Sequence, residues 1–184
     1  MIDKPKKLWE RNPEEYRIFL ACDITQKISE EKIPFYEKIG KLCDKMGYPA
    51  FLPHRTLGIG YKEGVTDNDV YVTCNEIIMP HVDLVIAYLG IPSVDVGVMI
   101  GRAKSLGKDI IYLFERKFTR EVIDGFKINV AYIFRSPETM LKYIEILRKM
   151  EMHFPFAVIK FDREEEALEL LEKELDDFFK RYRK

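Results

Sequence analysis

Apolar residues along this chain fall into two alternating patterns. The first consists of short apolar runs, which predict β-strands. The runs at 83–89 and 109–114 are nearly continuous, as expected for strands covered on both faces of a sheet. The full set of expected strands is 16–22, 50–52, 83–89, 109–114 and 129–134, with 156–161 as a sixth candidate.

The second pattern has helical spacing and occurs in segments 30–46, 67–79 and 96–106. Thr66 can cap the second segment, and Gly47 and Gly107 follow the first and the third. Strands that alternate with helices over short connections indicate βαβ units and a parallel sheet. The sequence therefore predicts one α/β domain over residues 1–184. The expected architecture is a flavodoxin-like or Rossmann-like three-layer sandwich, with a mostly parallel sheet of five or six strands.

The C-terminal segment 162–184 predicts a further helix. Its apolar stripe follows a three-four spacing and comprises Leu168, Leu171, Leu175, Phe178 and Tyr182. Two interpretations fit this stripe. The helix packs on the sheet of its own subunit, or it pairs with a second copy in a homodimer or higher oligomer.

Composition narrows the function classes. With 30 basic and 31 acidic residues, the net charge of −1 gives no electrostatic footprint for a nucleic-acid backbone. No apolar run approaches the ~20 residues that cross a membrane, and the N-terminus lacks the apolar region of a signal peptide. Cys22, Cys43 and Cys74 have no metal-ligand spacing and are expected to be reduced core thiols. We expect a cytoplasmic protein without a metal or cofactor; the single glutamine among many Lys and Glu residues hints at a thermophilic source.

Chemistry is expected in the loops that follow the strands, because ligands of open parallel sheets bind beyond the carboxyl ends of the strands. The most suggestive loop covers residues 90–95 and leads into a helix that contains Gly97 and Gly101. Ser93 and the first amides of that helix can bind an anion, although Ser93 and Asp95 are also ordinary capping residues.

The stretch VDLVIAYLGIPSVDVGVMIGRAKSLGKDIIYL, which begins at Val82, resembles the signature region of the nucleoside 2-deoxyribosyltransferase superfamily. The closest branch is that of the 2′-deoxynucleoside 5′-phosphate N-hydrolases. The matching positions are Asp83, Pro92, Ser93, Gly97, Gly101-Arg102-Ala103 and Leu106-Gly107-Lys108. The resemblance covers roughly residues 16–116 and is specific around 83–108.

This resemblance implies a flavodoxin-like sheet and a nucleoside or nucleotide as small-molecule partner, often with a dimer completing the site. Ser93 falls at the position that contacts the 5′-phosphate in the hydrolase branch. His54 and Arg55 lie one loop away and could add a hydrogen-bond donor or a charge. The alternatives are a capping or core-edge histidine and a solvated surface cation.

Two departures bear on catalysis. The family carries a carboxylate two residues before Gly-Arg-Ala, where this chain has Met99, and a second acid where it has Asn75. A thioether cannot form a glycosyl ester, and an amide cannot act as a general acid. Met99 also fits the apolar stripe of its helix. Asp23 and Asp95 are the nearby carboxylates that could substitute, with Asp23 the better placed to contact a ribose hydroxyl.

Three functions follow. The first is a nucleotide- or nucleoside-binding protein without the usual glycosidic chemistry. The second is an active N-glycoside hydrolase or deoxyribosyltransferase that uses displaced carboxylates. The third is an oligomeric interaction module with a vestigial cleft.

Overall fold

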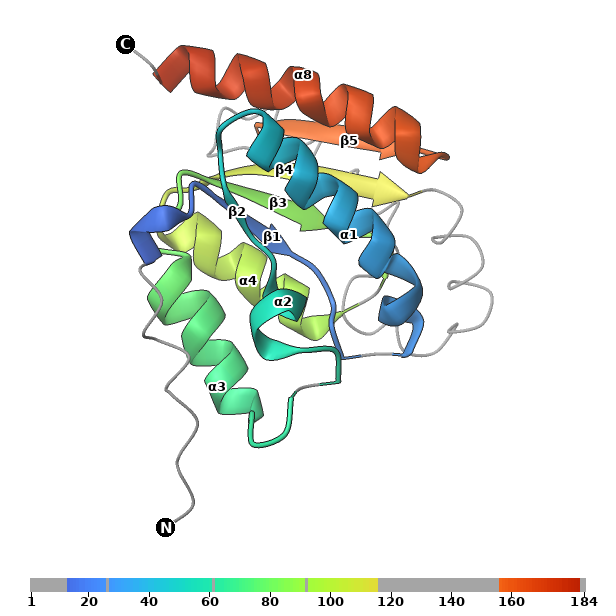
Figure 1. Ribbon diagram of the computed structural model, residues 1–184. Coiled ribbons are helices and arrows are strands. Elements are labelled where there is room, and N and C mark those ends of the chain that lie inside the picture. The colour runs from blue at the N-terminus through green and yellow to red at the C-terminus, as the bar shows by residue number, and fades with distance from the viewer. Residues whose placement is uncertain (1–12, 26, 61, 92, 116–155, 183–184) are drawn as a thin grey trace.

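The computed structural model describes residues 13–25, 27–60, 62–91, 93–115 and 156–182 (Figure 1). Within these ranges, five strands form one sheet in which every pairing is parallel. The strands are β1 (Ile18–Ala21), β2 (Ala50–Phe51), β3 (Leu84–Tyr88), β4 (Asp109–Glu115) and β5 (Ala157–Phe161). The strand expected at 129–134 lies outside the described residues.

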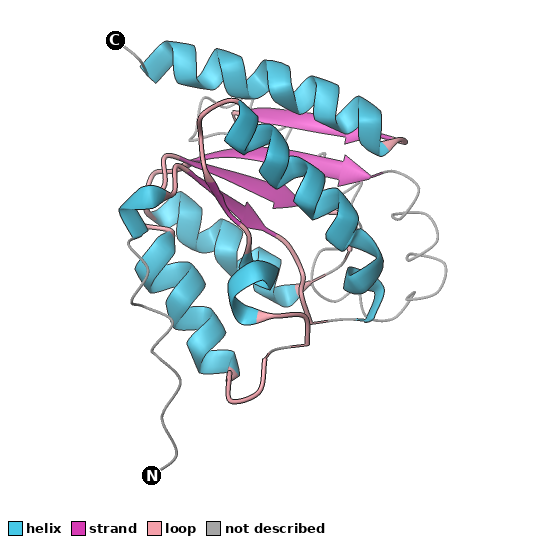
Figure 2. Cartoon of the chain, viewed as in Figure 1, coloured by secondary structure: helices cyan, strands magenta, loops and turns pink. Residues whose placement is uncertain are grey.

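Helices cover both faces of the sheet, which confirms the predicted three-layer α/β architecture (Figures 1 and 2). One face carries α1 (Lys27–Lys45) and α8 (Glu164–Tyr182). The other carries α4 (Val94–Ser105), together with α3 (Asp67–Tyr71) and the π-helical segment η3 (Val72–Ile78) that continues it. Among the described residues, no helix combines the length and the apolarity needed to cross a membrane.

The middle of the sheet is the core of the molecule. All residues of β1 and β3 are buried, and the two strands pair from Ile18 opposite Leu84 to Ala21 opposite Ala87. This burial is what the nearly continuous apolar run at 83–89 predicts, because a strand covered on both faces has no solvent-facing side. The edge strand β5 instead alternates between buried and partly buried positions. All three cysteines are free and buried, as expected for core thiols.

Local signals set several helix ends. The Thr66 side chain accepts a hydrogen bond from the Asp69 amide and completes a capping box at the start of α3. Gly47 and Gly107 have φ angles of 80° and 67°, the left-handed conformation that glycine adopts most easily after a helix.

The helices differ from expectation at the start of α1 and after β2. α1 begins at Lys27 rather than at residue 30, and it contains Pro34. The loop expected after β2 contains a single helical turn, α2 (Pro53–Leu57). Proline suits a first helical position because its missing N–H would have no intrahelical partner there. A shorter 3₁₀ turn, η2 (Pro13–Glu15), precedes β1.

The apolar stripe of the C-terminal helix packs inside the subunit. In α8, Leu171 and Leu175 are fully buried, and the helix lies against β5 and α1 (Figure 1). The ring of Phe179 stacks on that of Tyr48, with centroids 3.4 Å apart. Most of the stripe is therefore already covered by the chain's own core, which favours the first of the two interpretations of this helix.

Candidate functional site

The strand order β2-β1-β3-β4-β5 places the reversal of strand order between β1 and β3. In doubly wound sheets, the loops that leave the strands on either side of such a point diverge and leave a crevice for ligands. A cavity of about 430 Å³ lies here, between the loop after β1 and helices α3 and α4. Its lining residues are Thr25, Gly60, Asp67, Val70, Tyr71, Asn75, Asp95, Val98 and Met99.

Asp95 enters this cavity from the first turn of α4. Ser93, the residue before the helix, acts as its N-cap: the Ser93 Oγ accepts a hydrogen bond from the Val96 amide at 3.4 Å. The pKa of the Asp95 carboxyl lies above its usual range. Partial removal of water is the main cause, and the charges of Asp23 and Asp67 add to it. Three carboxylates therefore influence one another around the cavity.

Asp23, directly after β1, is fixed by hydrogen bonds from other residues of the protein. Its carboxylate accepts hydrogen bonds from the Ser29 hydroxyl at 2.6 Å and from the Thr25 amide at 3.0 Å. Only 2% of Asp23 is exposed, and Thr25, rather than Asp23 itself, lines the cavity. The geometry makes Asp23 an organiser of the loop after β1 and a source of negative potential for Asp95.

Asn75 and Met99, the two positions at which the sequence resemblance leads us to expect an acid, line the same cavity. Met99 is 3% exposed and also belongs to the main core, so its side chain packs in the core and lines the cavity. The Asn75 side-chain nitrogen donates to the Tyr71 carbonyl at 3.1 Å. The side-chain Oδ1 of Asn75 is buried and has no hydrogen-bond partner among the described residues. A buried acceptor without a partner is costly, which makes this atom a place for a ligand donor.

The π-helical geometry of η3 accounts for the position of Asn75. Thr73, Cys74 and Asn75 are consecutive and all buried, which a regular amphipathic α-helix does not favour. π-helical turns are rare and occur frequently at functional sites. Helical periodicity alone predicts a helix here without this local widening.

His54 and Arg55 lie on α2 and contact Glu37 of α1 instead of the cavity. Arg55 makes a two-point ion pair with Glu37, with nitrogen–oxygen distances of 2.9 and 2.7 Å. The His54 Nε2 lies 2.7 Å from the same carboxylate. The Arg55 hydrogen bond is the largest cause that lowers the pKa of Glu37 to about 2. The structure thus places neither residue among those that line the cavity.

Gly97 lies one turn into α4 and is partly exposed, also without lining the cavity. Conversely, Asp67 and Tyr71 line it, although the sequence pattern did not single them out. Their signal was present: they are spaced four apart at the start of a capped helix, so they share one face. What the sequence lacked was the knowledge that this face turns toward α4.

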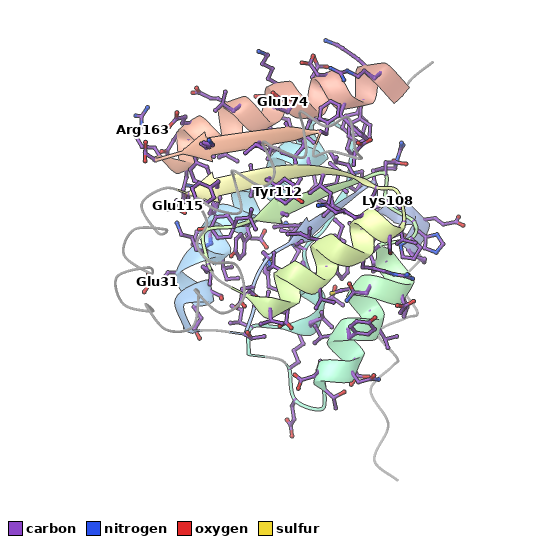
Figure 3. The ribbon with its side chains drawn as sticks, turned by 180° about the vertical axis from the view of Figure 1, so that it is seen from behind. Glu31, Lys108, Tyr112, Glu115, Arg163 and Glu174 are labelled. Atoms are coloured by element: carbon purple, nitrogen blue, oxygen red, sulfur yellow. The ribbon has the colours of Figure 1, made fainter. Side chains whose placement is uncertain are left out.

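A second group of buried polar side chains lies at the ends of β3 and β4. Glu115, the last residue of β4, lies 2.8 Å from the Lys32 ammonium and accepts a 2.6 Å hydrogen bond from the Tyr88 hydroxyl. Figure 3 shows Glu115 at one end of β4 and Lys108 near the other. Lys32 and Glu115 are only 6% and 5% exposed, so this pair joins α1 to the sheet inside the protein. In the described part of the chain, no cluster of three or more His, Cys, Asp or Glu side chains is arranged to hold a metal ion.

A scan against protein-family models finds no match, and no curated protein matches the chain. Among solved structures, it is similar to the CMP N-glycosidase BcmB of Clostridium botulinum, with a TM-score of 0.53 and 20% sequence identity. The alignment covers 84% of this chain and 96% of that one. This likeness shows a shared fold over nearly the whole neighbour.

Proposed function

We propose that this protein binds a nucleoside or nucleotide in the cavity between the loop after β1 and helices α3 and α4. The observation that carries the proposal is that Asn75 lines the cavity and that its buried Oδ1 lacks a partner in the described structure. The position of the cavity at the strand-order reversal supports it. So does the fold shared with the CMP N-glycosidase BcmB.

The residues at the two family positions favour binding without the usual glycosidic chemistry. Met99 offers a thioether and Asn75 an amide at the wall of the cavity, and neither group can attack an anomeric carbon or protonate a leaving base. A sensor or a regulatory subunit would need only the binding step.

The test is a thermal-shift screen against nucleosides, their 5′-monophosphates, ribose phosphate and deoxyribose phosphate, followed by calorimetric titration of each hit. We expect at least one nucleoside or nucleotide to bind, and Asn75→Ala to weaken it about tenfold through the lost hydrogen bond. Asn68→Ala is the matched control, because Asn68 is exposed on the same helical segment and does not line the cavity. An absence of binding across the panel, or equal effects of the two variants, would overturn the proposal.

A second candidate function, N-glycoside hydrolysis, is favoured by one observation: Asp95 is a carboxylate with a raised pKa at the cavity wall. In this reaction, water adds to the anomeric carbon, the bond to the base nitrogen breaks, and the base leaves with a proton. Asp95 would take the proton of the water or stabilise the positive charge of the sugar. Asp23, the other displaced carboxylate, is bound internally by Ser29 and Thr25.

Chromatography of overnight incubations distinguishes the two functions. Free base that disappears with Asp95→Asn would establish hydrolysis, and binding without free base would establish a binding protein. The interaction-module hypothesis stays a prediction, and so does a homodimer that completes the site. Measurement of the molecular mass in solution tests both.

A further inference from the structure

The cavity wall is acidic and contains no described cation. Asp67 and Asp95 line it, and neither carboxylate has an ion-pair or hydrogen-bond partner within the described residues. No Lys, Arg or His belongs to the lining that the structure describes. Arg55, the cation that the sequence analysis placed near the ligand, already forms an ion pair with Glu37. Among the described residues, a ligand that enters here therefore meets negative charge without a compensating cation.

The two helix N-termini at the cavity do not reverse this sign. Asp67 occupies the first turn of α3 and Asp95 the first turn of α4. An acid in the first turn offsets the partial positive charge of the helix dipole, and each carboxylate carries about twice that partial charge. The arrangement disfavours a phosphate at the position where helix ends otherwise attract one.

Part of the remaining wall is apolar and exposed. Tyr71 is 47% exposed and Val98 42%, although both are large hydrophobic side chains, and both line the cavity. An aromatic ring beside aliphatic side chains is the type of surface on which a nucleobase stacks.

The polar wall presents hydrogen-bond acceptors. The carboxylates of Asp67 and Asp95 accept, and the buried Oδ1 of Asn75 accepts and is without a donor in the described structure. Sugar hydroxyls and base amino groups are donors and satisfy such atoms. A phosphate dianion offers only further acceptors, so it satisfies none of them.

We infer that the cavity selects an uncharged nucleoside over its 5′-monophosphate, an inference that rests on the proposed function. The base packs against Tyr71, and sugar hydroxyls or base amino groups donate to Asp67, Asp95 and Asn75. Ser93, at the cap of α4, then stabilises the helix instead of holding a phosphate.

Calorimetric titration of matched pairs tests this inference: each nucleoside and its own 5′-monophosphate, at pH 7.5 and low salt. We expect the nucleoside to bind at least about tenfold more tightly, because like charges brought together in a site are strongly disfavoured. Asp67→Asn and Asp95→Asn should each raise the affinity for the monophosphate relative to the nucleoside. Asp44→Asn, the same charge change at an exposed position of α1, should leave the ratio unchanged.

The stacking contact has its own control. Tyr71→Ala should weaken nucleoside binding about tenfold or more, whereas Tyr71→Phe keeps the ring and should keep the affinity. A monophosphate that binds as tightly as its nucleoside, with no response to the two amide variants, would overturn the inference and leave the proposed function standing. If neither member of any pair binds, both proposals fail.

Discussion

The guanidinium of Arg102 on α4 donates from Nε to the backbone carbonyl of Asn75 at 3.2 Å, and so joins the two helical segments that line the cavity. A second nitrogen of Arg102 pairs with Glu76 at 3.0 Å. The arginine of the Gly-Arg-Ala triplet thus fixes the segment that carries Asn75 without itself lining the cavity.

Replacement of Arg102 by methionine should impair ligand binding more than stability. The ion pair is partly exposed, so its loss costs about 1 kcal/mol of unfolding free energy. Loss of the bond to the Asn75 carbonyl should release η3 and lower nucleoside affinity several-fold. Glu76→Gln is the matched control, since it removes the ion pair and keeps the bond to the carbonyl. Titration calorimetry and urea denaturation measure the two effects, and equal affinities of both variants would contradict this role.

Gly90 should tolerate no larger residue. A Cβ at this position would overlap the hydroxyl and ring of Tyr88, which is fully buried and bonded to Glu115. We expect Gly90→Ala to lower the unfolding free energy by about 1–3 kcal/mol, the usual range for overpacking.

Gly101→Ala is the comparison for that variant. A Cβ at Gly101 meets no neighbouring atom, and the residue lies inside α4, where alanine is the better helix former. We expect Gly101→Ala to be neutral or to stabilise by up to about 1 kcal/mol. Urea denaturation of both variants checks the contrast, and a Gly90→Ala protein as stable as the parent would refute the predicted overlap.

Lys32→Met should destabilise strongly because it leaves the Glu115 charge buried without its ammonium. Removal of one partner of a buried ion pair costs about 3–5 kcal/mol. Glu115→Gln should cost less: Tyr88 can still donate to the amide oxygen, and Lys32 keeps a contact with Glu164 at 3.4 Å. Equal losses for the two variants in chemical denaturation would contradict this asymmetry.

Glu37 should contribute to stability in a pH-dependent way. Hydrogen bonds from Arg55 and His54 lower its pKa from 4.5 to about 2 in the folded protein. A carboxylate with a depressed folded-state pKa adds stability that is complete above the unfolded pKa, near 4.5, and is lost as the pH falls toward about 2.

The Glu37→Gln variant isolates that contribution. Because about a third of the side chain is exposed and water screens the pair, we expect a loss of only about 1 kcal/mol at pH 7. The difference from the parent should shrink as the pH is lowered from 4.5 to 3. Glu31→Gln, at an exposed position of the same helix, should show no such trend. Urea midpoints across this range provide the measurement, and a difference that grows on acidification would refute the assignment.

Local sequence patterns predict the elements of this fold well where the signal lies within a few residues. The continuous apolar run at 83–89 predicts the buried strand β3, and Thr66 predicts the start of α3. Ser93 is the N-cap of α4, one of its two expected roles. The segment 129–134 lies outside the described residues, and its predicted strand stays a prediction.

The site was only partly predictable. Asp95 was identified by its place at a strand–helix junction, and Asn75 and Met99 by the family resemblance; the structure places all three at the cavity. Tyr71 and Asp67 were missed, because helical periodicity gives the shared face of two residues but not the element that this face meets. Arg55 was expected near a ligand, yet its partner is Glu37, on the preceding helix.

The sequence by itself determined the alternation of strands and helices, the buried character of the central strands and several helix ends, because these depend on interactions between near neighbours in the chain. Only the tertiary structure decided the strand order, the π-helical turn that buries Asn75, and the meeting of α3 with α4 around an acidic cavity. These features depend on which surfaces pack together across long sequence separations, and the competition among such packings leaves no periodic trace in the sequence.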